Sequence, residues 1–386
     1  MKIVHLCLSS VYIDNHTYQE NMLPKYHVLQ GHDVTVIASL VSFDSNGRPC
    51  LLEKESVHQT KEGYKVIRVD YKKIFYKLNK FIRRYNDISI LLENEKPDLI
   101  FIHDFSFIDI YKVIRYVSKN KNIVVYVDCH TDYINSAKTW ISKNLFHHFI
   151  WRHYAKLLTP FVKMYYGVTP LRCDFLRDAY KIPEKKIQLL VMGVDDEMLK
   201  QKDHTLIRQQ NRNNLSLNPT DFVILTGGKI DMVKNIHLVM GAVNKLENQN
   251  VKLVVFGTVD PKMKEYFDEL LKSDKIIFIG WLNSEAIMDL FISSDLIVFP
   301  GTHSVMWEQA VGVGVPCVFK YWEGMTHVDV GGNCEFLYQD SEQEMLEVLN
   351  KIIDDKEKYD LMKSVAIAKG LNYFSYSEIA YRAINQ

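Results

Sequence analysis

The 386-residue sequence lacks several motifs that identify metal- or nucleotide-dependent enzymes. It has no Asp-x-Asp pair, whose carboxylates could hold a divalent ion against a diphosphate, no G-x-x-x-x-G-K-[ST] phosphate loop and no H-E-x-x-H zinc motif. Residues 9–16, after the first apolar run, contain no glycine, which argues against a dinucleotide-dependent dehydrogenase. We therefore expect no metal and no cofactor, so that lysines and backbone amides would neutralise any bound phosphate.

The sequence is also poor in features of exported and membrane proteins. Its six cysteines are scattered without a C-x-x-C pair, which excludes a disulfide framework and suits a reducing cytosol. No apolar stretch approaches the roughly 18 residues of a spanning helix. Met1–Val4 runs straight into an apolar segment without the succession of regions typical of a signal peptide. We expect a cytoplasmic protein whose contact with a membrane, if it has one, is peripheral.

The net charge is zero, because Lys plus Arg and Asp plus Glu both total 47. This balance argues against a nucleic-acid-binding protein. It conceals an asymmetry, since residues 1–200 carry a net charge of +7 and residues 201–386 one of −7. The split predicts two domains with different neighbours, one of which could be an anionic surface.

Short runs rich in Val, Ile, Leu and Phe alternate with longer segments of helical period, a pattern typical of buried parallel strands crossed by helices. It predicts an α/β fold with two doubly wound, Rossmann-like units in series, joined by the polar, strand-free residues 195–219. Two such units could place the carboxyl ends of their strands across one cleft. The predicted strands are 2–8, 34–38, 99–103, 123–127, 164–168 and 187–191 in the first unit, and 222–225, 252–256, 275–279, 295–299 and 316–319 in the second.

Glycines and lysines follow the predicted strand 222–225, in the run from Thr226 to Lys234. Glycines let a backbone approach a ligand closely, and a helix start, here with Asn235 as its expected cap, presents free N–H groups to an anion. Lys229 and Lys234 are electrostatically misplaced at that end of a helix unless an anion lies there. The segment is a candidate phosphate site; the alternative is that both lysines point into water.

Glu308 belongs to a second candidate segment, after the predicted strand 295–299. With Ser304 as the expected N-cap, Glu308 falls in the second helical turn, one position too late for a capping box. Its carboxylate could accept hydrogen bonds from vicinal hydroxyls such as those of a ribose. The alternative is a favourable acidic residue near a helix N-terminus.

Histidines also follow predicted strands of the first unit, as His103-Asp104 and His130-Thr131-Asp132. A histidine at the carboxyl end of a strand can donate to sugar hydroxyls or to charge that develops on a reacting group. The alternative, a packed and hydrogen-bonded histidine, applies here and to His16, His303 and His327.

The order and spacing of these segments resemble the GT-B glycosyltransferases and, among them, the large retaining family 4. The similarity covers nearly the whole chain. The segments that carry it are Gly31–Ile37 (G-H-E-V-T-V in the family), Lys96–Asp104 (K-P-D-hydrophobic-H-D), Val191–Asp195 (ending N-G-V-D), Gly227–Asn235 (G-R-hydrophobic…K-N, with Lys229 for Arg), Ser294–Pro300 (A-D-hydrophobic-P) and Glu308–Pro316 (E-A…G-hydrophobic-P).

The resemblance implies a GT-B architecture, with an acceptor domain over residues 1–198, a donor domain over 199–371 and a tail, 372–386, packed on the first domain. It implies metal-independent transfer, with retained configuration, from a UDP- or GDP-sugar to a saccharide or lipid-linked saccharide. Bacterial surface polysaccharide or glycolipid assembly is the expected setting.

The resemblance also implies roles for individual residues. Lys229 and Lys234 would neutralise the donor diphosphate, Glu308 would hold the ribose hydroxyls, and His103 would face the sugar at the reaction centre. The expected donor site comprises Gly227, Gly228, Lys229, Lys234, Gly257, Trp281, His303, Ser304 and Glu308, and the expected acceptor site Tyr12, Asp14, Asn15, His16, His130 and Asp132.

Two departures from the family pattern bear on the substrates. The first acid of the family's E-x7-E motif falls on Pro300, and His303 and Ser304 occupy a segment that looks four residues shorter than usual. The loop after the first strand has no Gly-Gly pair, so its side chains could contact the acceptor instead. Two alternatives therefore stay open: a sugar-nucleotide epimerase of the same architecture, and a catalytically silent GT-B-like binding partner.

Two basic segments account for the charge of the first half. Residues 71–85 carry six basic residues and no acid, and no acid occurs in 133–173, which includes a second basic, aromatic segment at 138–163. The apolar residues of 71–85 recur at helical spacing, so we expect them to pack on the first sheet while the cations face water. Basic amphipathic helices are also drawn to anionic lipid. Peripheral contact with the inner face of a membrane through 71–85 and 138–163 is therefore a hypothesis.

Overall fold

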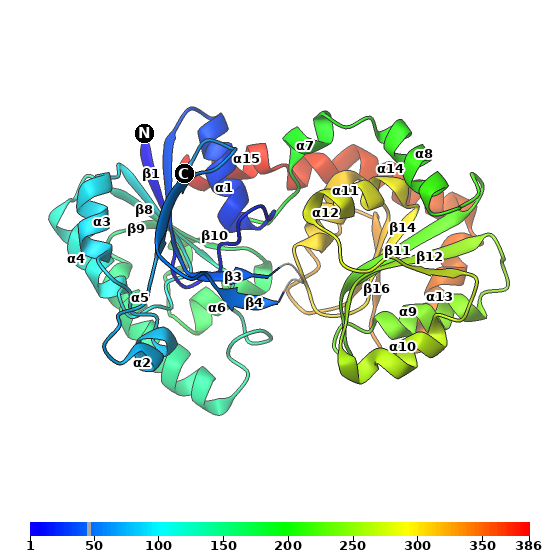
Figure 1. Cartoon of the computed structure of the whole chain (residues 1–386), viewed down its shortest axis with the longest axis horizontal. Coiled ribbons are helices and arrows are strands. Elements are labelled where there is room, and N and C mark those ends of the chain that lie inside the picture. The colour runs from blue at the N-terminus through cyan, green and yellow to red at the C-terminus, as the bar shows by residue number, and fades with distance from the viewer. Residues whose placement is uncertain (45–47) are drawn as a thin grey trace. The chain divides into compact units, whose positions relative to one another are not determined.

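The computed structural model describes residues 1–44 and 48–386, which form two compact units. Unit 1 comprises Met1–Met192 and Tyr376–Gln386, and unit 2 comprises Gly193–Ser375. Each unit contains one mainly parallel sheet covered by helices (Figure 1). The predicted α/β class with two Rossmann-like domains is confirmed.

The sheet of unit 1 has the strand order β10-β9-β8-β7-β1-β2-β6-β5, and only β5 runs antiparallel to its neighbour. A separate hairpin pairs β3 with β4. The strands are β1 Lys2–Cys7, β2 Asp33–Ser39, β3 Val41–Phe43, β4 Pro49–Leu51, β5 Ser56–Gln59, β6 Lys65–Val69, β7 Leu99–His103, β8 Val124–Cys129, β9 Val162–Gly167 and β10 Ile187–Leu189. The helices are α1 Gln19–Leu29, α2 Tyr76–Phe81, α3 Ile88–Glu95, α4 Ile110–Lys119, the π-helical η1 Ser142–Trp151, α5 Arg152–Leu158, α6 Pro170–Asp178, the 3₁₀ turn η2 Glu184–Lys186 and α15 Tyr376–Ile384.

The sheet of unit 2 is parallel throughout, in the order β13-β12-β11-β14-β15-β16. Its strands are β11 Phe222–Ile230, β12 Val251–Val259, β13 Ile276–Phe278, β14 Leu296–Phe299, β15 Cys317–Lys320 and β16 Cys334–Leu337. Its helices are α7 Asp196–Lys200, α8 His204–Asn214, α9 Ile236–Lys245, the 3₁₀ turn η3 Pro261–Met263, α10 Lys264–Leu270, α11 Ser284–Ser293, α12 Met306–Val313, α13 Glu342–Ile353 and α14 Lys356–Phe374.

Burial explains why the apolar runs became strands. All five residues of β7 are buried, and the central residues of β1 and β8 are buried as well. A strand covered on both faces has no reason to alternate apolar with polar residues, which is the pattern that the sequence shows. Because the strands are parallel, the residues after β1, β7 and β8 lie together at one edge of the sheet.

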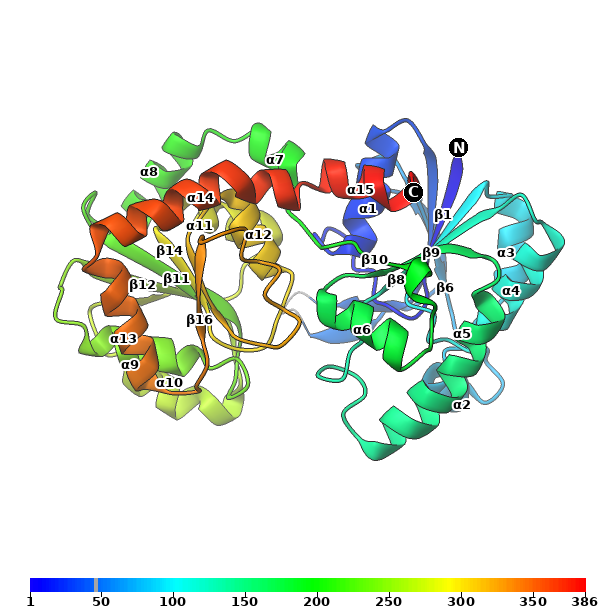
Figure 2. The same ribbon diagram turned by 180° about the vertical axis from the view of Figure 1, so that it is seen from behind.

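The division into units differs from the predicted boundaries. The predicted boundary at 198/199 lies six residues beyond the observed one, because the Val194 N–H donates to the Phe374 carbonyl, which ties Val194 to α14 of unit 2. The tail that joins unit 1 begins at Tyr376 rather than 372. There α15 packs beside α1 (Figure 2), and the hydroxyls of Tyr126 and Tyr166 donate to its carbonyls.

Other elements depart from the sequence pattern. The predicted linker contains α7 and α8, whose N-termini are capped by Asp195 and Asp203. Strand β11 continues through Gly227–Lys229, the residues that we expected to follow it. The helix expected across 71–85 covers only Tyr76–Phe81, and much of its apolar stripe is exposed to solvent, so the expectation that the stripe packs on the sheet is wrong.

Candidate active site

His103 and Asp128 meet at the carboxyl edge of the unit 1 sheet. His103 ends β7, Asp128 lies near the end of the neighbouring β8, and His103 Nδ1 is 2.7 Å from Asp128 Oδ2. Both side chains are fully buried. Burial raises the pKa of Asp128, but the neighbouring His103 and His130 outweigh it and hold the pKa below the usual range. Asp128 is therefore a carboxylate.

His103 also begins a chain of three stacked histidines that runs away from this edge into the core. His103 Nε2 is 3.0 Å from His5 Nδ1, and His5 Nε2 is 3.0 Å from His27 Nδ1. The chain ends where His27 Nε2 lies 3.1 Å from the carbonyl oxygen of Ala380 in α15. The rings of neighbouring histidines are 5.2 Å apart.

The chain holds one proton more than three neutral imidazoles would supply. It contains four hydrogen bonds, and both of its ends, the Ala380 carbonyl and the Asp128 carboxylate, can only accept. Four protons are needed, whereas three neutral rings carry three. Burial lowers the pKa of His5, and it lowers that of His27 to about 3. One of the three rings therefore carries a second proton, and the carboxylate at the end of the chain that balances its charge is Asp128.

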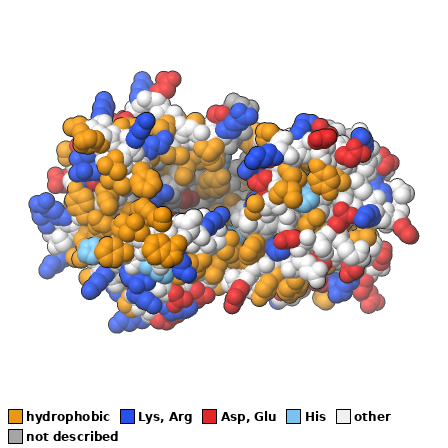
Figure 3. Space-filling model, turned by 90° about the horizontal axis from the view of Figure 1, so that it is seen from below, with side chains coloured by type: hydrophobic (Ala, Val, Ile, Leu, Met, Phe, Trp, Pro, Cys, Tyr) orange, Lys and Arg blue, Asp and Glu red, His pale blue; other side chains and the backbone are white. Residues whose placement is uncertain are grey.

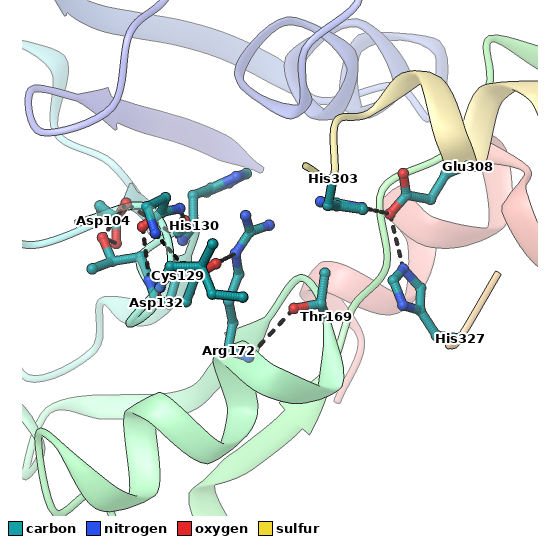
Figure 4. A network of polar contacts seen from close by, with 12 residues as sticks. Asp104, Cys129, His130, Asp132, Thr169, Arg172, His303, Glu308 and His327 are labelled. Carbon is teal, nitrogen blue, oxygen red and sulfur yellow. Dashed lines mark hydrogen bonds and ion pairs between the residues drawn. The ribbon is translucent and has the colours of Figure 1, made fainter. Parts of the chain in front are cut away.

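This geometry corrects the expectation that His103 contacts the sugar, because its ring is buried and both of its nitrogens are occupied. His130, at the same edge (Figure 4), keeps 19% of its side chain exposed, and its Nε2 lies 3.4 Å from Asp128 Oδ2. Burial lowers the pKa of His130, but the charges of Asp128 and Glu20 raise it to about 9. His130 is thus a cation at neutral pH.

Of the other residues expected at the acceptor site, Asp132 and Tyr12 are buried, whereas Asp14, Asn15 and His16 are at least partly exposed. Asp132 is buried and pairs with Arg172, with 3.1 Å between its Oδ2 and the arginine Nε (Figure 4). In the loop after β1, Tyr12 is buried with its hydroxyl on Tyr64, which corrects its expected contact with an acceptor. Asp14 is partly exposed and pairs with Arg68 at 2.6 Å. Next to it, His16 is half-buried and Asn15 is exposed.

In unit 2, the end of β11 lies very close to β12. A Cβ atom on Gly257 would lie 1.8 Å from the carbonyl oxygen of Gly228, so the absence of a side chain at Gly257 permits this approach. Gly257 also has a φ of 124°, which favours glycine.

Gly227, Lys234 and Ser304 line one cavity of about 10 Å³, far smaller than typical ligand pockets of about 300–1,000 Å³. Trp281 stands half-exposed after Gly280.

The two candidate phosphate-binding lysines differ. Lys229 is exposed, and its Nζ lies 3.0 Å from Asp231 Oδ2, a hydrogen bond that raises the pKa of the lysine. Lys234 is partly buried just before α9, where burial lowers its pKa. Its Nζ donates to the Thr302 carbonyl at 2.7 Å, and it takes part in none of the ion pairs among residues 1–44 and 48–386. The side chain of Asn235 does not cap α9, because it donates to the Pro300 carbonyl and to Asp340.

Glu308 is fully buried between two histidines (Figure 4). Its Oε1 is 2.8 Å from His303 Nε2 and 2.9 Å from His327 Nε2, while its Oε2 has no partner in the described part of the chain. Burial raises the pKa of Glu308, but the two histidines lower it to about 2. Helix α12 begins at Met306 with Val305 as its N-cap, so Glu308 lies in the first turn and Ser304 is not the cap.

Two groups of side chains, His103-Asp128-His130 and His303-Glu308-His327, could be considered as metal sites. Bonds of about 2.0–2.1 Å to a tetrahedral zinc would separate the ligand atoms by roughly 3.4 Å. The 2.8 and 2.9 Å contacts to Glu308 fit direct hydrogen bonds instead. In the first group, His103 uses both nitrogens for hydrogen bonds. Neither group has the geometry of a zinc site.

Several of these residues could not be selected from the sequence. His5 lies inside an apolar strand and His27 in a helix, and only the fold brings His5 against His103 and His27 against His5. His327 is one of the histidines that the sequence suggests could be packed and hydrogen-bonded, but no pattern connects it with Glu308, nineteen residues earlier.

Comparison with known families gives matches over both units. Residues 207–368 match the model described as Glycosyl transferases group 1, and residues 23–198 match the model described as Glycosyltransferase Family 4. A protein of Methanocaldococcus jannaschii, named only as an uncharacterized glycosyltransferase, is 24% identical over 160 residues. That match spans 39% of this chain and 40% of the relative.

Solved structures share the fold over whole chains. The sucrose-phosphate synthase of Thermosynechococcus elongatus has a TM-score of 0.71 at 13% identity, covering 99% of this chain and 97% of its own. HepE of Anabaena, solved with UDP and glucose, has a TM-score of 0.67 at 16% identity, covering 99% and 98%. The two family models together cover most of the sequence, and the chain belongs to the GT-B glycosyltransferases of the group 1 type.

Proposed function

We propose that the protein transfers a sugar from a UDP- or GDP-sugar, bound by unit 2, to a saccharide or lipid-linked saccharide acceptor bound by unit 1. The observation that carries the proposal is Lys234, a partly buried cation beside the N-terminus of α9 without a carboxylate partner among the described ion pairs. A cation is unfavourable at that end of a helix unless an anion balances it. The diphosphate of a nucleotide-sugar is such an anion, and HepE, which shares the fold, was solved with UDP.

Binding of the donor requires Lys234 to change partner. In the described structure its ammonium group donates to the Thr302 carbonyl, and the small cavity there leaves no room for a diphosphate. A phosphate oxygen would replace that carbonyl as the acceptor and form a stronger, charge-assisted hydrogen bond. Lys229, which is already paired with Asp231, supplies a weaker second contact. The lysine then stabilises the negative charge that develops on the leaving diphosphate, without a metal ion.

Glu308 is the proposed partner of the ribose. His303 and His327 occupy its Oε1 and keep the group ionised, which leaves Oε2 as the acceptor for a ribose hydroxyl. This arrangement gives the short segment between Pro300 and Glu308 a function, since His303 holds the carboxylate from within it. The configuration at the anomeric carbon is proposed to be retained, as the resemblance to family 4 implies.

A panel of UDP-, GDP- and dTDP-sugars tests the proposal. Slow hydrolysis of one donor in the absence of acceptor, with NMR of the anomer released, would support a retaining transferase. Inversion at C2 would instead support the epimerase, and binding without turnover the silent partner. Failure to bind any nucleotide-sugar would refute the proposal.

We further propose that unit 1 contacts anionic membranes through residues 71–85 and 138–163, at the inner face of the cell membrane during surface polysaccharide or glycolipid assembly. In support, Ile74 and Phe75 are each 79% exposed in a stretch without acids, and Trp140 is 76% exposed. Of the helices that the structure describes, none combines the length and the hydropathy needed to span a bilayer. Sedimentation with anionic vesicles at low and high salt tests this contact; no binding at low salt would refute it.

A further inference from the structure

Unit 1 contains a cavity of about 490 Å³ that the sequence did not indicate. This volume lies within the range of ligand pockets, about 300–1,000 Å³. The cavity begins at the carboxyl edge of the sheet, beside residues that follow β1, β7 and β8, and extends between α2 and η1. None of the six residues expected at the acceptor site lines it.

One end of the cavity is polar. Asp104 follows β7 and is largely buried, and burial raises the pKa of its carboxyl. Thr131 Oγ1 lies 3.3 Å from Asp104 Oδ2. Arg83 reaches the same end, where its Nη1 donates to Ser9 Oγ at 3.2 Å and to the Ser106 carbonyl at 2.7 Å. Carboxyl, hydroxyl and guanidinium groups at the carboxyl edge of a parallel sheet form a suitable environment for sugar hydroxyls.

The other end reaches the surface and carries most of the large apolar side chains of the wall. They include Phe81 and Ile141, which are 68% and 57% exposed, and the more buried Phe146, Ile150 and Trp151; the polar residues Ser136, Thr139, Ser142 and His147 also line the cavity. Figure 3 shows hydrophobic side chains gathered among Lys and Arg side chains on this face of unit 1. Large apolar side chains exposed in a contiguous patch mark a binding surface.

The charge around the apolar end favours an anionic or neutral ligand. Residues 71–86 and 133–173, which include α2 and η1, contain no acidic side chain. A peptide partner would find few carboxylates to pair with its cations there. A molecule with a hydrocarbon chain and a hydroxylated head fits both ends of the cavity at once.

We infer that this cavity binds an amphiphilic acceptor, a saccharide joined to a hydrocarbon chain, with the sugar beside Asp104 and the chain between α2 and η1. This inference rests on the proposed transferase function, in which unit 1 binds the acceptor. The inferred acceptor is a lipid-linked saccharide and not a free one. Its hydrocarbon chain lies inside the cavity, which distinguishes this binding from the proposed contact of residues 71–85 and 138–163 with a bilayer.

Calorimetric binding of alkyl glucosides tests the inference without requiring turnover. Glucose and its hexyl, octyl and decyl glucosides are titrated below their micelle-forming concentrations. Each CH₂ group taken into the cavity should tighten binding roughly fourfold, the equivalent of about 0.8 kcal/mol, until the cavity is full. Equal binding of glucose and decyl glucoside would overturn the inference, and so would the absence of binding by the alkyl glucosides below those concentrations.

Two variants separate the cavity from the surface. Ile141→Glu places a charge in the apolar wall and should weaken binding of decyl glucoside at least tenfold. Phe149→Glu is the matched control, because Phe149 lies in η1, the helix that Ile141 caps, is 71% exposed and does not line the cavity. Equal loss in both variants, or no loss in Ile141→Glu, would contradict the inference. The donor panel uses no amphiphile, so failure of either experiment leaves the other interpretable.

Discussion

Replacing His5 by phenylalanine should disconnect the histidine chain of unit 1 at its centre. The substitution keeps an aromatic ring against Phe101, whose centroid lies 5.4 Å from that of His5. It removes two hydrogen bonds, one to His27 Nδ1 and one to His103 Nε2. The two nitrogens left without a partner, His27 Nδ1 and His103 Nε2, then face a hydrocarbon ring inside the core.

The expected cost follows from these two unpaired groups. A buried donor or acceptor without a partner costs about 1–3 kcal/mol, so the free energy of unfolding should fall by about 2–6 kcal/mol. This is a large part of the typical total of 5–15 kcal/mol.

Urea unfolding measures this cost, with His153→Phe as the control. His153 is exposed on α5, so its substitution should change stability by no more than about 0.5 kcal/mol. NMR of ¹⁵N-labelled histidine in the parent protein should show one of the three rings protonated on both nitrogens. Equal stability of His5→Phe and the parent, or three singly protonated rings, would refute the proton count.

Two further predictions concern single carboxylate and histidine side chains. His130 has a folded-state pKa of about 9 against 6.5 in the unfolded chain, so it stabilises the fold below pH 6.5, and this contribution is lost as pH rises through 9. Between pH 6.5 and 9, the free energy of unfolding of His130→Gln should therefore fall less than that of the parent protein, by at most about 3 kcal/mol. Melting temperatures over this pH range measure the difference, and identical pH profiles would contradict the raised pKa. Glu308→Gln should weaken UDP binding about 10- to 100-fold, the value of a hydrogen bond to a charged group, and unchanged affinity in calorimetry would remove Glu308 from the donor site.

Strands of the sheets could be predicted where burial alone decides them. The range 99–103 agrees with β7, because a strand buried on both faces is a continuous apolar run. The glycines at the end of β11 were expected to terminate that strand, yet backbone pairing with β12 extends it through Lys229. Periodicity also identified the apolar stripe in 71–85, but it could not show that much of the stripe is exposed to solvent, because spacing indicates only which residues share a face of a helix.

The site could be located from the sequence more readily than it could be oriented. His103 and Glu308 were identified by their positions after strands, and both proved to be buried in hydrogen-bonded clusters. Their partners are 98 residues away in the case of His5 and nineteen in the case of His327. Contacts over such separations are set by the packing of whole elements, which no local pattern records.

The turnover of Lys234→Met tests whether Lys234 binds the diphosphate of a nucleotide-sugar. Methionine keeps the unbranched apolar stem, so the variant should fold like the parent while it loses the charge. With the donor identified by the panel, the account predicts a loss of about 10- to 100-fold in turnover, larger than that of Lys229→Met, whose lysine is already paired with Asp231. Equal turnover of Lys234→Met and the parent protein would contradict the proposed binding of the diphosphate by Lys234.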